Sequence, residues 1–156
     1  MPQYPPIWDD WSSTSVKMNL KADIKPSEDP ELVLKSVQTL FPSFNLKIES
    51  NSVIGNSSDP KSLDHLCQRI MEQRILDATR RVAMGGATTE SIDENPVLTV
   101  LCFNKQVALV DKVAIAEPED SPLGVIELSI ITEKLKDFID VAFPKYEWLV
   151  PKKMQE

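Results

Sequence analysis

The side chains best suited to binding chemistry are four arginines on a segment, residues 59–84, whose pattern predicts one long helix: Arg69, Arg74, Arg80 and Arg81. On such a helix Arg74, Asp77 and Arg81 share a face at spacings of three and seven residues. Asp77 can neutralise the two arginines in an ion cluster, or the arginines can form a row that contacts phosphates or another subunit. Arginine suits both roles because its planar fork binds carboxylates and phosphates bidentately.

A second polar group, Asn104-Lys105-Gln106, follows an apolar run at residues 97–103. A polar triplet after an apolar run is typical of a simple turn. A lysine and two amides at the end of a strand are also positioned to meet a phosphate and a base edge. Both interpretations stay open from the sequence.

Residue types needed for common catalysis are scarce. His65 is the only histidine, and its helical spacing from Lys61 and Arg69 predicts a solvated position. Cys67 and Cys102 are isolated, so we interpret both as small buried hydrophobes. The four glycines form no phosphate-binding pattern. We therefore expect no enzyme activity and no cofactor.

Carboxylates gather in two expected loops, at Glu90, Asp93 and Glu94 and at Glu117, Glu119 and Asp120. Carboxylate groups of this kind can hold Mg²⁺. Solvated acidic loops are the simpler interpretation, and we expect no metal site.

Composition limits the class of protein. The 156 residues suit one domain with a core, and the net charge of −7 argues against a generic basic coat for nucleic acids. The acidic excess is concentrated in residues 1–15 and in the two loops within residues 85–120, so the rest of the domain is nearly neutral and could still carry a local basic face. The N-terminus lacks a signal-peptide pattern, and the longest apolar run is far too short for a membrane span. We expect a cytoplasmic protein without a membrane partner.

The pattern of apolar residues predicts an α+β fold. Residues 16–24 alternate as a half-buried strand, and a helix then begins with Ser27 or Asp29 as its cap. Further strands are expected at residues 44–48, 53–54, 97–103, 107–115 and 125–131, and a last helix at residues 133–143. The run at 97–103 lacks alternation, which predicts an internal strand covered on both faces.

These elements predict a mostly antiparallel sheet of about five to six strands with helices packed on one face. We expect a single domain at residues 16–151 and a tail at 152–156. The predicted core comprises Leu20, Val37, Leu40, Leu46, Leu66, Ile70, Leu101, Phe103, Ile126, Leu128, Phe138 and Trp148.

Residues 1–15 contain prolines and two tryptophans, Trp8 and Trp11. A disordered tail or an expression remnant is one interpretation. The other, which we adopt for the domain plan, is a strap whose tryptophans dock on the domain or on a second subunit.

Four short blocks carry a resemblance: residues 73–78, 104–106, 121–124 and 148–151. In this order and spacing the chain resembles an uncharacterised archaeal protein family whose fold is similar to the 5S-rRNA-binding ribosomal protein of the large subunit. The resemblance implies RNA binding by analogy of fold. The chain departs from the family pattern at Val107, Asp111 and Ala114, where the family has Ala, Gly and Asn.

Two hypotheses follow. The first is a non-catalytic RNA-binding protein that uses Arg69, Arg74, Arg80, Arg81, Lys105 and Gln106. The second is a protein-interaction or assembly module, a homodimer, without nucleic acid. The acidic balance favours the second and the resemblance favours the first. Pairing of the arginines with carboxylates would remove the main RNA contacts.

Overall fold

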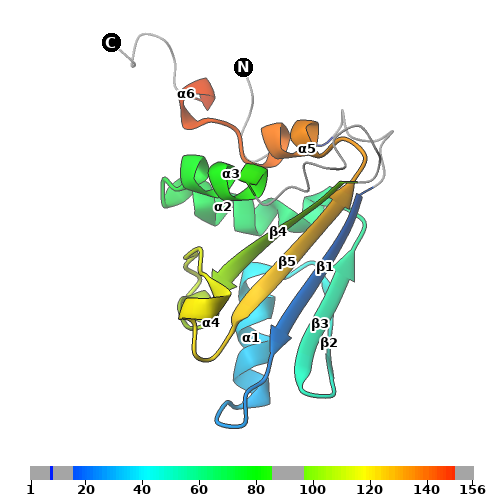
Figure 1. Ribbon diagram of the computed structural model, residues 1–156, viewed down its shortest axis with the longest axis vertical. Helices are drawn as coiled ribbons and strands as arrows, with labels where there is room; N and C mark the ends of the chain where they lie inside the picture. Colours follow the sequence, from blue (N-terminus) through cyan, green and yellow to red (C-terminus); the bar gives the residue numbers. More distant parts are fainter. Residues whose placement is uncertain (1–7, 9–15, 86–96, 150–156) are drawn as a thin grey trace.

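The computed structural model describes residue 8 and residues 16–85 and 97–149 of the chain. These residues form one antiparallel sheet of five strands in the order β2-β3-β1-β5-β4 (Figure 1). The strands are β1 (Val16–Asp23), β2 (Asn45–Glu49), β3 (Ser52–Ser57), β4 (Val97–Asn104) and β5 (Val125–Thr132). The predicted α+β class with a mostly antiparallel sheet is confirmed.

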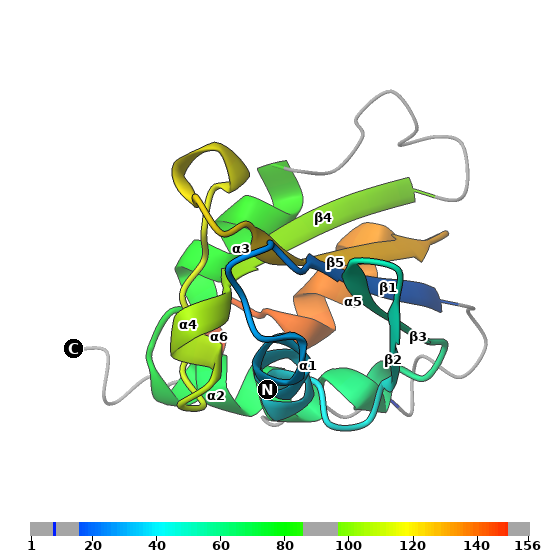
Figure 2. The same ribbon diagram turned by 90° about the horizontal axis from the view of Figure 1, so that it is seen from below.

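The helices lie together on one side of the sheet, as Figure 2 shows for α1, α2 and α5. The longer helices are α1 (Pro30–Leu40), α2 (Asp64–Glu72), α3 (Leu76–Gly85) and α5 (Leu135–Ala142). The short ones are α4 (Lys105–Ala108), α6 (Tyr146–Leu149) and the 3-10 turns η2 (Pro60–Leu63) and η4 (Pro118–Asp120). Among the described residues, none of the four longer helices covers the opposite face of the sheet, which is called the open face.

Local sequence signals explain β1 and α1. Buried and exposed side chains alternate along all eight residues of β1, as its sequence predicts. Asp29, the second of the two predicted caps, begins α1, because its Oδ1 accepts a hydrogen bond of 3.0 Å from the backbone N–H of Glu31. Pro30 occupies the first helical position, where no N–H is needed.

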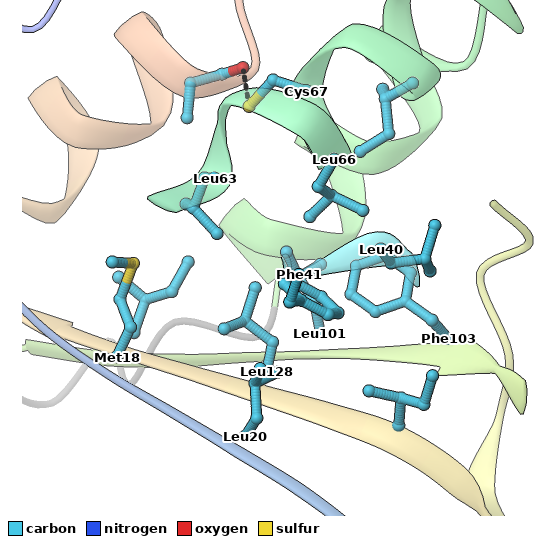
Figure 3. Close-up of a cluster of buried hydrophobic side chains, with 14 of the residues drawn as sticks. Met18, Leu20, Leu40, Phe41, Leu63, Leu66, Cys67, Leu101, Phe103 and Leu128 are labelled. Atoms are coloured by element: carbon cyan, nitrogen blue, oxygen red, sulfur yellow. Dashed lines mark hydrogen bonds between the residues drawn. The ribbon is translucent and has the colours of Figure 1, made fainter. Parts of the chain in front are cut away.

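The core fills the space between the sheet and the helices. Figure 3 shows Leu20, Leu128 and Leu101, from three neighbouring strands, pointing toward Leu66 of α2. The members of the predicted core are fully buried with two exceptions. Leu46 and Trp148 are half-buried instead.

The single helix predicted at residues 59–84 is wrong. The chain breaks after α2, where Arg74 has a left-handed backbone with φ 61°, and α3 then starts at Leu76. Beyond the break the buried positions are Leu76, Thr79 and Ala83, one residue later than the uninterrupted pattern requires. The shared face predicted for Arg74 and Arg81 therefore does not exist.

The internal position predicted for residues 97–103 is also wrong, because β4 is an edge strand whose sheet neighbour is β5. The strand predicted at residues 107–115 would have flanked it. Those residues instead contribute to α4 and a loop, which returns to β4 only as an isolated bridge between Ile115 and Phe103. Asn104 explains the helical turn, since its Oδ1 accepts from the N–H of Val107 at 3.0 Å.

Trp8 packs on the helical layer. Its ring lies 5.1 Å from that of Phe138, and its Nε1 donates to Asp64 Oδ1 at 2.9 Å. The side chain is almost fully buried. Docking of the predicted strap on the domain therefore holds for Trp8, while Trp11 and the tail at 152–156 lie outside the described residues.

Candidate functional site

Lys105 points inward rather than toward solvent. It is 5% exposed, and its Nζ donates to the backbone oxygens of Leu123, at 2.6 Å, and of Asp23. A carboxylate oxygen of Glu28 lies 3.0 Å from the same nitrogen. An ammonium group has three donors, so these contacts leave none for a phosphate.

The two residues that flank Lys105 have different roles. Asn104 caps α4, whereas Gln106 is exposed. Gln106 borders a hollow of about 400 Å³ with Ser121, Leu123 and Gly124. The blocks at 104–106 and 121–124, distant in sequence, therefore meet around the buried lysine.

Arg80 is tied to the C-terminal part of the chain. Its Nη2 lies 2.7 Å from Asp140 Oδ1, and its Nη1 donates to the backbone oxygen of Phe143 at 3.3 Å. The guanidinium also lies 5.0 Å from the ring centroid of Trp148, a cation–π distance. Arg80 is thus a packing residue that joins α3, α5 and α6.

Arg69 belongs to a surface cluster that the sequence did not reveal. Its guanidinium lies 3.0 Å from Glu72 and 3.7 Å from Asp111. Asp111 also contacts His65, with 2.7 Å between its Oδ1 and the Nε2 of His65. His65, predicted to be solvated, is half-buried in this contact.

Position 111, where this chain has Asp in place of the glycine expected from the resemblance, has an unusual backbone conformation. Its φ is 62°, a left-handed backbone that favours the glycine expected there. The aspartate tolerates this conformation and adds a carboxylate toward α2. Gln73 holds the same loop, since its amide exchanges two hydrogen bonds with the backbone of Val113, at 2.7 and 2.8 Å.

Arg74 and Arg81 are exposed, and no carboxylate of the described residues lies within ion-pair distance of either. Asp77, predicted to neutralise them, accepts a hydrogen bond of 3.0 Å from the backbone N–H of Tyr146 instead. Arg81 borders a hollow of about 400 Å³ together with Arg80, Lys145 and Glu147.

The six predicted contact residues therefore do not form one site. Arg69, Arg80 and Lys105 are engaged within the protein, and Arg74, Arg81 and Gln106 remain available on separate elements. Within residues 16–85 and 97–149 no group of histidine, cysteine and carboxylate side chains is arranged to hold a metal ion.

The open face of the sheet carries an apolar patch at its β4 edge. It consists of Leu98, Val100 and Cys102 of β4 with Ile131 of β5, which is paired with Leu98. Leu98 is 39% exposed and the other three are half-buried. Cys102, predicted to be buried, thus lies partly open to solvent, whereas Cys67 is fully buried.

The thiol of Cys102 is nevertheless hard to ionise. Its partial burial, together with the negative charges of Glu127, Glu117 and Glu119, raises its pKa from 9.0 to about 11. Glu127 is its direct cross-strand neighbour. A nucleophilic role at neutral pH is therefore disfavoured.

No helix among the described residues is long and apolar enough to cross a membrane. The described residues form an antiparallel α+β fold with the longer helices on one face of the sheet. No family model matches the chain.

Curated relatives define the family. A UPF0201 protein of Sulfurisphaera tokodaii is 32% identical over 141 residues, which cover 87% of this chain and 88% of the relative. A UPF0201 protein of Sulfolobus acidocaldarius is 33% identical and covers 85% and 86%. The chain belongs to the UPF0201 family.

Solved structures agree with this assignment. The crystal structure of a UPF0201 protein from Methanococcus jannaschii matches with a TM-score of 0.69 and 28% identity, over 83% of this chain and 93% of that one. The predicted membership of an uncharacterised archaeal family is confirmed by these relatives. The likeness to the ribosomal protein stays a prediction.

Proposed function

We propose that the protein is a non-catalytic assembly module that forms a homodimer through the edge of β4. One observation carries the proposal. The sequence of β4 predicts a strand with neighbours on both sides and cover on both faces, whereas β5 is its one neighbouring strand among the described residues. In the proposed dimer, β4 of a second copy is the neighbour on the other side.

The side chains of β4 support this role. The strand has no charged residue and no proline, and its pairing with β5 runs without a bulge. Charges, prolines and bulges are the usual features that prevent edge strands from pairing with other chains. The apolar patch of Leu98, Val100 and Ile131 adds area that association would bury.

Residues 114–116 occupy the C-terminal end of the β4 edge, so the proposed pairing involves the part of the edge around Val100. At the C-terminal end of β4, Cys102 accepts a hydrogen bond from Ala116, and Asn104 donates one to Ala114, both at 2.9 Å on the side away from β5. Backbone groups alternate in direction along a strand, so the N–H and C=O of Val100 point to the same side. Antiparallel pairing of this edge with its own copy is symmetric about a twofold axis.

Molar mass in solution tests the dimer. Light scattering during size-exclusion chromatography should give twice the chain mass of 17.5 kDa for the wild type. Leu98→Lys and the double variant Leu98→Lys/Val100→Lys should shift the mass to that of one chain, because lysine opposes pairing at an edge. Val110→Lys, a change at a side chain that is 68% exposed after α4, is the matched control. A wild-type monomer at all concentrations would refute the proposal.

RNA binding is the second candidate, supported by Arg74 and Arg81, which have no ion-pair partner in the described part of the chain. Arg81 beside Lys145 offers a local positive charge on a chain that is acidic overall. So small a site can neutralise few phosphates, and each contributes only about 0.7 to the log–log salt slope for a single strand. Binding should therefore be weak and moderately sensitive to salt.

Titration of labelled single-stranded and duplex RNA at several salt concentrations tests this candidate. Arg81→Glu should weaken binding, whereas Lys35→Glu, the same change of charge on α1, should not. Arg80 is left intact because Asp140 depends on it. Equal binding by both variants would remove this site.

A further inference from the structure

Three asparagines form a row across the open face of the sheet. Asn56 of β3 is paired with Asn19 of β1 on one side and with Asn45 of β2 on the other. All three are exposed. Side chains directly opposite each other on neighbouring strands have their Cβ atoms about 5 Å apart, so the amides present one continuous polar edge.

The fold does not explain this row. Asparagine is depleted in β-strands, where branched and aromatic residues are favoured. Within the described part of the chain no side-chain hydrogen bond engages any of the three amides. Asn104, by contrast, caps a helix. The row therefore carries hydrogen-bonding capacity that folding leaves unused.

The amides border a hollow of about 440 Å³, which lies within the size range of small-molecule sites. Ile54 contributes an apolar surface and Lys47 a positive charge to its lining. Gly55 keeps β2 and β3 close at this point, because a Cβ there would lie 2.9 Å from the backbone oxygen of Asn45. The close approach of β2 and β3 beside the hollow therefore requires glycine at position 55.

The combination points to one ligand chemistry. The carboxamide of asparagine matches the N6 donor and N7 acceptor of adenine bidentately. Ile54 can contact the face of the base, and Lys47, whose Nζ lies 3.0 Å from Glu49, is the nearby cation for a phosphate. We propose that this face binds an adenine nucleotide, with the base on the asparagine row and the phosphate toward Lys47.

A single nucleotide fits better than a nucleic-acid strand. Proteins that bind single strands stack successive bases on aromatic side chains. The one aromatic residue of the five strands, Phe103, is fully buried on the helical side. The proposal is independent of the dimer, because β4 lies at the opposite edge of the sheet from β2.

Nuclear magnetic resonance with adenosine monophosphate tests the site. Titration should shift the side-chain NH₂ signals of Asn19, Asn45 and Asn56, and adenosine and ribose 5-phosphate should each bind more weakly. Lys47→Gln should reduce the preference for the monophosphate over adenosine. A short oligoadenylate, as the second source of the same base, should bind no more tightly than the monophosphate.

Two variants separate binding from folding. Asn19→Thr and Asn56→Thr should each lower the affinity at least tenfold while the melting temperature stays the same or rises, because threonine is the better strand residue. Asn51→Thr, at the β2–β3 turn outside the row, is the matched control and should keep wild-type affinity. Absent shifts at millimolar ligand, or unchanged affinity in the threonine variants, would overturn the proposal. Tighter binding of the oligoadenylate would overturn its restriction to a single nucleotide.

Discussion

Glu28 and Lys105 form an ion pair beneath the surface, with 3.0 Å between Glu28 Oε1 and Lys105 Nζ. The same carboxylate oxygen accepts a hydrogen bond from the backbone N–H of Lys25 at 2.9 Å. The pair joins the segment before α1 to the start of α4 and to the loop that precedes β5. The ion pair with Glu28 shows that Lys105 has a structural role. Its position after an apolar strand had also been compatible with a contact to phosphate.

Lys105→Met should lower the free energy of unfolding by about 3 kcal/mol, because it leaves the largely shielded carboxylate of Glu28 without its partner. Lys47→Met, which removes a lysine from an exposed pair with Glu49, should change it by less than about 1 kcal/mol. Urea titration of both variants measures the difference. Similar losses in the two variants would contradict a structural role for Lys105.

Asp140 should make stability depend on acid pH. Burial alone would raise the pKa of this carboxyl, but hydrogen bonds and positive charge from Arg80 and Lys136 outweigh it and hold the pKa below 3.8. A lowered folded-state pKa stabilises the fold above the unfolded value, and this contribution is lost as the pH falls below about 5.

Asp140→Asn should therefore destabilise the protein more at pH 7 than at pH 3, as measured by urea unfolding across this range. Asp137→Asn removes the same charge from α5 and is the control for net charge. A destabilisation by Asp140→Asn that is constant with pH would show that the Arg80 contact does not depend on the charge of the carboxylate.

Cys102 should react slowly with iodoacetamide at pH 8, because a thiol with a pKa of about 11 is almost fully protonated there. Glu127→Gln should speed the reaction by removing the nearest negative charge. Mass spectrometry of the alkylated peptide against pH measures both rates. Rapid labelling of the folded wild type at neutral pH would contradict the raised pKa.

Leu101→Ala should lower the free energy of unfolding by about 2–5 kcal/mol, because the side chain is fully buried between the sheet and the helices. Leu32→Ala, on the exposed side of α1, should have a much smaller effect. Denaturant titration compares the two. A loss at Leu101 well under 2 kcal/mol would remove it from the core.

The elements governed by local rules could be predicted from the sequence. The alternation of β1 matches its burial residue by residue, and the cap of α1 falls at one of the two expected positions. Both depend on neighbours within a few residues, so the pattern contains the information needed.

The errors arose where distant contacts decide the local structure. The helix breaks at Arg74, directly after Gln73, and the side-chain amide of Gln73 is hydrogen-bonded to the backbone of Val113, forty residues away. Likewise β5 pairs with both β1 and β4 and leaves β4 at the edge. Apolar periodicity does not encode which strands become neighbours.

The same limit applies to the candidate sites. The arginines were recognised by residue type, but their partners Asp111 and Asp140 depend on the tertiary fold. The asparagine row became visible only through the register of three strands. One sequence signal for it existed, since asparagine is an unusual residue at the outward positions of a strand.

Hydrogen exchange at the backbone amide of Val100 is the most direct test of dimerisation through β4. If this edge pairs with a second copy, the amide is protected at high protein concentration, and the protection decreases on dilution and in Leu98→Lys. The amide of Leu101, on the side facing β5, stays protected throughout and serves as the internal reference. Fast exchange at Val100 at every concentration, with Leu101 still protected, would contradict the proposed interface.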